Sequence, residues 1–272
     1  MRRAPGHVHR QPDRRVVVRI HPRARKKAGL LSPQHYVVKT LVTTELVRKI
    51  ADSYGVRTEG NLQVGFKYIG QTMDAVGPDK FVFGCEESHG YLVGQYARDK
   101  DAGVAAMLLA EYAATLKSQN KTLHDAMASI YWQHGYHLEK QLSLTMPGSA
   151  GMRDMQIIMA RFRTAPPKSL AGMRVIETRD YLELLKNSYD KDGHPTALPE
   201  PFFGPKGDMV IMELSAPGNF IAARPSGTEP KIKFYMFTYE SPEQLADLEE
   251  AKQQLTTRIK ALEDDLAAFA KL

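Results

Sequence analysis

The stretch RPSGTEPK at residues 224–231 decides the interpretation of this chain, because it joins two apolar, strand-like runs through a short polar loop. Arg224 offers a forked donor that suits phosphate, and the hydroxyls of Ser226 and Thr228 add further donors. Gly227 lets the backbone approach a ligand closely, so that successive N–H groups can face one anion. Flanking prolines lower the entropy that the loop loses on binding. An ordinary polar β-turn is the alternative, but the full combination favours a phosphate-binding loop.

Length and composition predict two domains of ordinary size. The 272 residues include 43% hydrophobic residues, enough to furnish both cores. No apolar run approaches the length of a membrane span, and no segment resembles a secretory signal. A single cysteine, Cys85, excludes an intramolecular disulfide and fits a reducing compartment. We therefore expect a cytoplasmic protein that has no membrane partner.

The net charge of +6 is concentrated at one end of the chain. Residues 1–35 contain eight Arg and two Lys against the single Asp13, so that the remaining residues are mildly acidic. The overall basicity is therefore no argument for nucleic-acid binding, and we expect no nucleic-acid partner. The basic arm itself has three interpretations: an anion-binding tail, a transit-like leader, or a start displaced by truncation or misreading of a longer gene. We favour the third.

Residues 36–133 alternate strand-like and helical segments, which is typical of an α/β domain with a mixed sheet. Amphipathic spacing and a cap at Thr43 or Thr44 predict the first helix, which ends at Gly55. Met107 belongs to the apolar face that we expect on a later helix. The expected strands lie at 36–39 and 80–83, and further helices lie at about 65–77, 102–116 and 123–131.

Residues 134–272 predict an α+β domain whose strands are largely antiparallel. Ser241, Pro242 and Gln244 predict a capping box that starts the last helix. Its apolar residues fit packing on the sheet of this domain better than a coiled-coil dimer. The expected strands lie around 138–144 and at 209–214, 219–223 and 231–239, and another helix contains residues 155–162.

The loop after the strand at 80–83 carries candidate sugar ligands. If this stretch is extended, Glu86 and Ser88 project to the same side, where a carboxylate and a hydroxyl can bind neighbouring sugar hydroxyls. His89 can titrate near neutral pH. A solvated turn at the end of a strand is the alternative interpretation.

Lys100 lies between Asp99 and Asp101, directly before a helix. Its acidic neighbours hold the ammonium charged, so that it can donate a proton or neutralise a phosphate. The local pattern alone favours Asp101 as an ordinary helix cap.

Together, the motifs GCEESHG at 84–90, RDKD at 98–101 and RPSGTEPK at 224–231 resemble the α-D-phosphohexomutase family of phosphoglucomutases and phosphomannomutases. The segment VGFKYI at 64–69 resembles a further signature. The resemblance spans about residues 36–272, in the order of the third and fourth domains of the family. It implies an isomerase of carbohydrate metabolism that moves a phosphoryl group between the 1- and 6-positions of a hexose. Family members use a phosphoserine and Mg²⁺.

The resemblance also implies roles for particular residues. Lys100 would be a general acid/base. The substrate-binding residues would be Gly65, Lys67, Glu86, Ser88 and His89, and the phosphate-binding residues Arg224, Ser226, Gly227 and Thr228.

Two motifs of the family are missing from this sequence. No serine loop of the Thr-x-Ser-His-Asn-Pro type is present, since Gly90 follows His89. No metal loop of the Asp-x-Asp-x-Asp-Arg type is present either, so Mg²⁺ is implied by the family while no residue here is assigned as a metal ligand. We therefore interpret residues 1–35 as a truncated or frame-disturbed remnant.

The resulting hypothesis is the C-terminal portion of a phosphohexomutase, incomplete as an isolated chain, whose partner is glucose or mannose 1- or 6-phosphate. A non-catalytic sugar-phosphate binding module, or an inactive remnant, is the alternative. The sequence leaves open the choice between glucose and mannose and the oligomeric state.

Overall fold

The structure is a computed structural model that describes residues 22, 26, 29–146, 148, 150–227 and 229–271. These residues fall into two compact units, an N-terminal unit up to Gly135 and a C-terminal unit from Tyr136 onward. Their order confirms the predicted fold class, an α/β domain followed by an α+β domain with a mostly antiparallel sheet.

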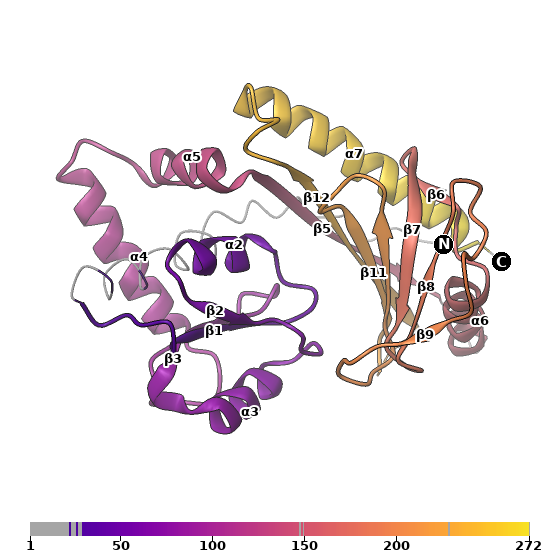
Figure 1. The fold of residues 1–272 in the computed structure, drawn as a ribbon, viewed down its shortest axis with the longest axis horizontal. Coiled ribbons are helices and arrows are strands. Elements are labelled where there is room, and N and C mark those ends of the chain that lie inside the picture. The colour runs from indigo at the N-terminus through magenta and orange to yellow at the C-terminus, as the bar shows by residue number, and fades with distance from the viewer. Residues whose placement is uncertain are drawn as a thin grey trace. The chain divides into compact units, whose positions relative to one another are not determined.

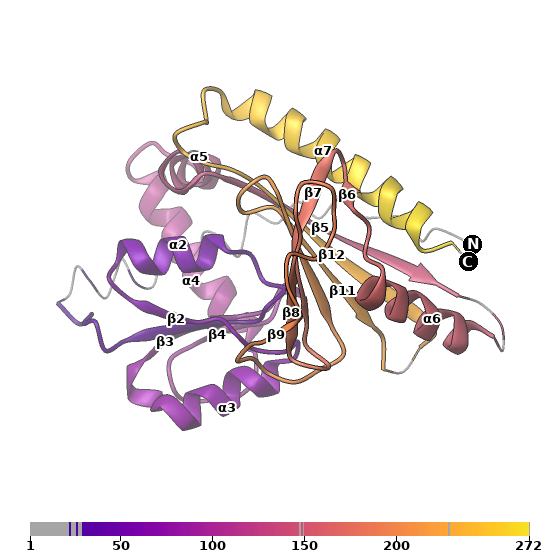
Figure 2. The ribbon, with the colours of Figure 1, turned by 45° about the vertical axis from the view of Figure 1, so that its right-hand side comes forward.

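The N-terminal unit is built on a four-stranded sheet in the order β2-β1-β3-β4. β1 pairs in parallel with both β2 and β3, and β4 returns antiparallel to β3. Figures 1 and 2 show α2 and α3 on opposite faces of this sheet. The elements are β1 (Tyr36–Lys39), α2 (Leu46–Ser53), β2 (Arg57–Glu59), α3 (Phe66–Val76), β3 (Phe81–Cys85), β4 (Tyr91–Val93), α4 (Ala102–Lys117) and α5 (Leu123–His134).

Apolar side chains of the sheet and of α3 make the core of this unit. Tyr36 and Val38 of β1 face Ile69 and Met73 of α3, and all four are fully buried. β3 ends at Cys85, the only cysteine of the chain, which is also fully buried. Because β1, β2 and β3 are parallel, the loops that follow them leave the same edge of the sheet.

The C-terminal unit contains an antiparallel sheet in the order β5-β12-β11-β10-β7-β8-β9, with β6 paired to β7. α6 and α7 both lie along this sheet (Figure 2). Their apolar side chains join those of the strands in one core, as those of an amphipathic helix do when its apolar face covers a sheet. The elements are β5 (Tyr136–Thr145), α6 (Gly151–Thr164), β6 (Ser169–Leu170), β7 (Met173–Asp180), β8 (Leu185–Ser188), β9 (Glu200–Pro201), β10 (Val210–Leu214), β11 (Phe220–Pro225), β12 (Lys231–Glu240) and α7 (Leu248–Phe269).

The last helix packs on the sheet as expected, but its predicted start is wrong. α7 begins at Leu248, and its N-cap is Asp247, whose Oδ1 accepts hydrogen bonds from the backbone N–H groups of Glu249 (2.7 Å) and Glu250 (2.9 Å). Ser241 and Gln244 lie in a turn before the helix, where Gln244 N donates to Ser241 O at 3.1 Å. A charged cap next to the first helical residue therefore replaces the expected capping box.

Two further expectations about helices need correction. Met107 is 59% exposed, and the buried positions of α4 are Ala105, Leu108, Tyr112 and Leu116. Glu45 occupies the cap position of α2 without a side-chain cap hydrogen bond, although Thr44 Oγ1 accepts from Leu46 N at 3.2 Å. Among the described helices, none combines the length and the apolar character that crossing a membrane requires.

The cap of α7 gives a direct stability test. Asp247→Ala leaves two backbone N–H groups without their acceptor, so we expect the free energy of unfolding to fall by about 1 kcal/mol. Ser241→Ala, which the sequence pattern predicted to be the damaging change, should lower it by less than about 0.5 kcal/mol. Urea denaturation of both variants measures the difference, and equal losses would contradict the cap assignment.

Candidate functional site

The Glu86–Gly90 segment is a tight hairpin turn between β3 and β4, so the extended conformation considered for it is wrong. Cys85 pairs with Tyr91, and Glu86 N donates to Gly90 O at 3.0 Å. Glu86 is 6% exposed, whereas Ser88 and His89 are exposed. The turn therefore holds one buried carboxylate beneath two exposed polar side chains.

Two residues explain how the turn closes. His89 adopts a left-handed backbone conformation with φ 64°, which a histidine rarely adopts outside turns. Gly90 follows, and a Cβ there would lie 2.8 Å from Glu86 Oε2 and 3.0 Å from the ring of Phe66. Only a glycine leaves room for the carboxylate of Glu86 at this place.

Glu86 is held in an environment that resists its ionisation. Burial raises the pKa of its carboxyl group, and the neighbouring charge of Glu87 acts in the same direction. The charge of Lys100 and a hydrogen bond from the backbone of Gly65 act in the opposite direction but are weaker. The structure therefore brings Gly65 and Lys100, both predicted site residues, into the surroundings of Glu86.

Lys100 is placed by the segment that follows β4. Asp101 N donates to Tyr91 O at 2.7 Å, while Asp101 Oδ1 caps α4 by accepting from Gly103 N at 2.7 Å. Lys100 Nζ donates to Asp99 Oδ1 at 3.0 Å, and this hydrogen bond raises the pKa of the ammonium group. The side chain of Lys100 is 54% exposed. The raised pKa keeps the ammonium group protonated at neutral pH, the form that can donate a proton or neutralise a phosphate.

Gly65 and Lys67 lie where α3 begins. Gly65 precedes the helix with φ 136°, a conformation that favours glycine. Lys67 is exposed on the first turn, with its Nζ 4.9 Å from the ring centroid of Tyr68. The helix start contributes backbone N–H groups that attract anions.

The predicted phosphate loop connects β11 and β12 of the C-terminal unit. Arg224 pairs with Lys233 in the ladder, and Ser226 N donates to Lys231 O at 2.8 Å where the loop begins. A Cβ at Gly227 would meet no atom within 4 Å, so the space beside its backbone is open. Thr228 lies outside the described residues.

Among the charged residues of this loop that the structure describes, Arg224 is the one available to bind a phosphate. Glu229 forms an ion pair with Lys231, and this hydrogen bond lowers the pKa of the Glu229 carboxyl group. The half-buried guanidinium of Arg224 has no hydrogen bond or ion pair with any of the described residues. A guanidinium at the start of an open loop can bind a phosphate through two parallel N–H···O hydrogen bonds.

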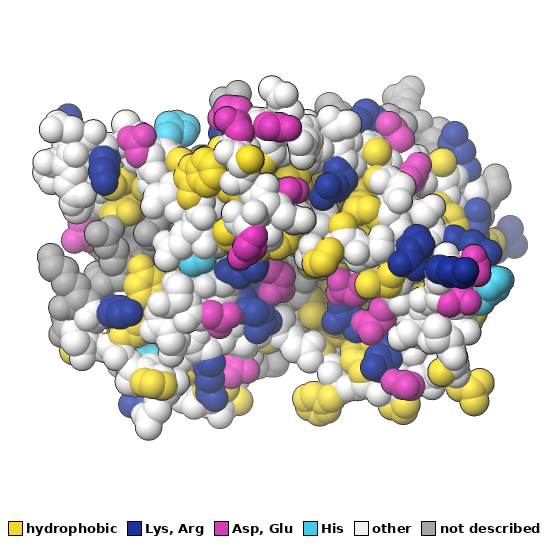
Figure 3. All heavy atoms as spheres, turned by 45° about the horizontal axis from the view of Figure 1, so that its top comes forward, with side chains coloured by type: hydrophobic (Ala, Val, Ile, Leu, Met, Phe, Trp, Pro, Cys, Tyr) yellow, Lys and Arg dark blue, Asp and Glu magenta, His cyan; other side chains and the backbone are white. Residues whose placement is uncertain are grey.

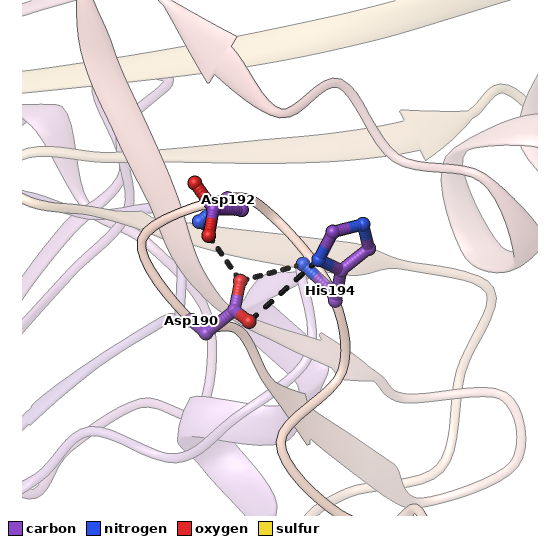
Figure 4. A group of neighbouring side chains, drawn as sticks. All are labelled: Asp190, Asp192 and His194. Atoms are coloured by element: carbon purple, nitrogen blue, oxygen red, sulfur yellow. Dashed lines mark hydrogen bonds and ion pairs between the residues drawn. The ribbon is translucent and has the colours of Figure 1, made fainter.

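A separate acidic group lies in the turn after β8. The side chains of Asp190, Asp192 and His194 lie close together in this turn (Figure 4). Their possible ligand atoms are within 4.8 Å of one another. Asp190 Oδ1 already accepts hydrogen bonds from the backbone N–H groups of Asp192 and His194, both at 2.9 Å. The carboxylate of Asp190 thus serves to close the turn.

Sequence reasoning missed a cluster of polar residues behind the hairpin. Lys39 is the last residue of β1, Thr40 and Thr43 follow it, and all three are buried. Their only signal in the sequence is a lysine at the end of an apolar run, which is more often an exposed strand end. The charges on the face seen in Figure 3 are mixed, because the basic and acidic side chains of the described residues are interspersed there.

Comparisons with known proteins identify the family of the chain. Residues 12–133 match the family model described as phosphoglucomutase/phosphomannomutase, alpha/beta/alpha domain III. A phosphoglucomutase of Staphylococcus haemolyticus (strain JCSC1435) is 35% identical over 206 residues, which cover 75% of this chain and 36% of that protein. A phosphoglucomutase of Staphylococcus aureus (strain bovine RF122 / ET3-1) is 37% identical over 201 residues, 74% of this chain and 35% of that protein.

A solved structure shares the fold. The open form of parafusin, an exocytosis-sensitive phosphoprotein and phosphoglucomutase from Paramecium, matches with a TM-score of 0.60 at 21% identity, over 95% of this chain and 42% of that one. The chain spans about a third of the length of the curated relatives that it matches. It belongs to the phosphoglucomutase/phosphomannomutase family.

Proposed function

We propose that this chain binds a hexose phosphate as part of a phosphohexomutase, which moves a phosphoryl group between the 1- and 6-positions of the sugar. Glucose and mannose phosphates are the candidate substrates, and the cytoplasm is the proposed compartment. The observation that carries the proposal is the open loop after β11, where Arg224 has no partner among the described residues.

The sugar is assigned to the N-terminal unit. Glu86 accepts hydrogen bonds from sugar hydroxyls, and Ser88 and His89 add contacts from the exposed part of the turn. Gly65 and Lys67 lie at the helix start that leaves the same edge of the sheet. A carboxylate that is largely shielded from water forms stronger hydrogen bonds with a hydroxyl than an exposed one does.

The phosphate that is not transferred is assigned to the C-terminal unit. Arg224 binds it through its guanidinium, and Ser226, Gly227 and Thr228 contribute hydroxyl and backbone donors. An anchor that fixes one end of the substrate holds the reacting group at the other end in place. Such positioning can lower the activation free energy by several kcal/mol.

Lys100 is proposed as the proton donor of the reaction. Its pKa is raised by Asp99, so the ammonium form predominates at neutral pH. The same positive charge stabilises negative charge that develops during phosphoryl transfer.

The acidic residues beside Lys100 and in the turn after β8 do not fit the magnesium ion that the family uses. Mg²⁺ requires near-octahedral oxygen ligands. Asp99 is bound to Lys100, Asp101 caps α4, and Asp190 closes its own turn together with a histidine. The sequence also contains no serine loop of the family type. We therefore assign to this chain binding and positioning of the substrate, and no step that involves the metal.

The phosphate anchor is tested by Arg224→Ala. Loss of a charge-assisted hydrogen bond should weaken the binding of glucose 1-phosphate at least about tenfold in isothermal titration calorimetry. Arg174→Ala is the matched control, because Arg174 is an exposed arginine of the same unit on β7. Unaltered affinity in Arg224→Ala would overturn the assignment of the loop.

Glu86 should show a trade between stability and binding. Because burial raises its pKa in the folded chain, the folded state is favoured by protonation, and this contribution is lost as the pH rises through the raised pKa. Glu86→Gln should therefore be more stable than the wild-type chain near neutral pH, with the difference vanishing at a pH below the ordinary pKa of glutamate. The same variant should bind glucose 1-phosphate more weakly.

Urea denaturation across this pH range, together with calorimetry, checks both effects. Glu111→Gln on α4 is the control, since Glu111 is exposed. If Glu86→Gln is no more stable than the wild-type chain at neutral pH, the folded state does not disfavour the ionised form of Glu86, and the assignment is wrong.

Catalysis by the isolated chain is a separate test. Glucose 1-phosphate, Mg²⁺ and a hexose bisphosphate should give no glucose 6-phosphate in a coupled assay, because the phosphoserine and metal loops are missing from the sequence. Binding without turnover supports the proposal. Robust turnover would show that this chain is catalytically sufficient, and absence of both would favour an inactive remnant.

A further inference from the structure

Lys39 is a buried lysine to which the proposed function gives no role. It is the last residue of β1, the strand that lies between β2 and β3, and its side chain is 1% exposed. An ammonium group in the interior is unfavourable unless its charge and its three N–H groups are all satisfied. The partners of Lys39 therefore show what holds it there.

Lys39 Nζ has three acceptors. It donates to the backbone oxygens of Thr40 (3.2 Å) and Thr43 (2.9 Å), and it lies 2.7 Å from Glu45 Oε1. Burial alone would raise the pKa of Glu45, but the charges of Lys39 and Arg48 outweigh burial and lower it. The lowered pKa keeps the Glu45 carboxyl group ionised at neutral pH, and its contact with Lys39 fixes the turn between β1 and α2.

The fixed turn is joined to the loop after β2. Leu41 N donates to Leu62 O at 2.9 Å. The aliphatic part of Lys39 also lies against Gly60, where an added Cβ would be 3.4 Å from Lys39 Cε. This loop runs directly into Gly65, whose backbone hydrogen bond reaches Glu86.

The same turn is joined to the hairpin after β3. Thr40 Oγ1 donates to Glu87 Oε2 at 3.4 Å and lies 2.8 Å from Thr43 Oγ1. A hydroxyl has one hydrogen to donate, so the Thr40 hydroxyl gives its hydrogen to Glu87 and accepts that of Thr43. The Thr43 hydroxyl thus donates to Thr40, and the Thr40 hydroxyl donates to Glu87 of the hairpin.

We propose that Lys39 and Thr40 are positioning residues, which hold the loops after β1, β2 and β3 in one arrangement and thereby fix the carboxylate of Glu86 for a hexose hydroxyl. The ligand in this inference rests on the proposed function. The positioning itself rests on the hydrogen bonds around Lys39, so the two can be tested separately.

Hydrogen exchange of the ligand-free chain tests the positioning. Thr40→Val keeps the shape of a fully buried side chain and removes its hydroxyl. Thr58→Val on β2 is the matched control, because the buried Thr58 Oγ1 has no hydrogen bond with any of the described residues. We expect the amides of residues 86–90 to exchange roughly fivefold faster in Thr40→Val, and unchanged in Thr58→Val, as loss of one buried hydrogen bond requires.

Calorimetry with glucose 1-phosphate tests the consequence for binding. Thr40→Val should weaken the affinity by roughly fivefold, whereas Thr40→Ser, which keeps the hydroxyl, should bind within about twofold of the wild-type chain. Thermal denaturation confirms that each variant is folded. If Thr40→Val does not fold, Glu87→Ala removes the same hydrogen bond from its partly exposed end and replaces it in both measurements.

The outcomes separate this inference from the proposed function. Equal exchange of residues 86–90 in Thr40→Val and Thr58→Val overturns the positioning role, as does full affinity of Thr40→Val in a chain whose wild type binds. If the wild-type chain does not bind glucose 1-phosphate, the proposed function fails, and the exchange comparison alone then upholds or overturns the positioning role.

Discussion

The parallel pairing of β1 with β2 on one side and β3 on the other is the constraint on which the N-terminal unit depends. Backbone hydrogen bonds align Val38 with Glu59 and with Gly84, so that the three strands end at one edge. Segments that are about 20 residues apart in the sequence therefore meet there as loops. A helix start, a buried carboxylate and a buried ammonium come together because the strands share a direction, and ligand sites of α/β sheets arise at such edges.

The sequence predicted most elements because their apolar residues follow helical or strand periodicity. The strands β10, β11 and β12 are apolar runs bounded by turn residues, and they form where expected. The predicted start of α7 was wrong because the sequence offers two plausible N-caps. One is Ser241, with Gln244 three residues later, and the other is Asp247, which is followed by two glutamates. Only the path of the preceding turn decides between them. β7, β8 and β9 were not predicted, because most residues of β7 and β8 are half-buried or exposed without clear alternation, and β9 consists of two exposed residues.

The candidate site was predictable to the extent that short motifs encode it. Glu86, Lys100 and Arg224 lie in recognisable segments, and the structure places the first two in one electrostatic environment. The roles of Lys39 and Thr40 could not be read from the sequence, because a buried lysine is recognised only when its acceptors are known. Those acceptors are mostly backbone oxygens, which leave no trace in the order of side chains.

Cys85 gives this architecture an internal reporter. It is the only thiol of the chain, it is fully buried, and it directly precedes Glu86. A thiol in this position reacts with an alkylating reagent only when the end of β3 opens transiently. The initial rate of labelling therefore measures how often the edge of the sheet loosens, without any substitution in the chain.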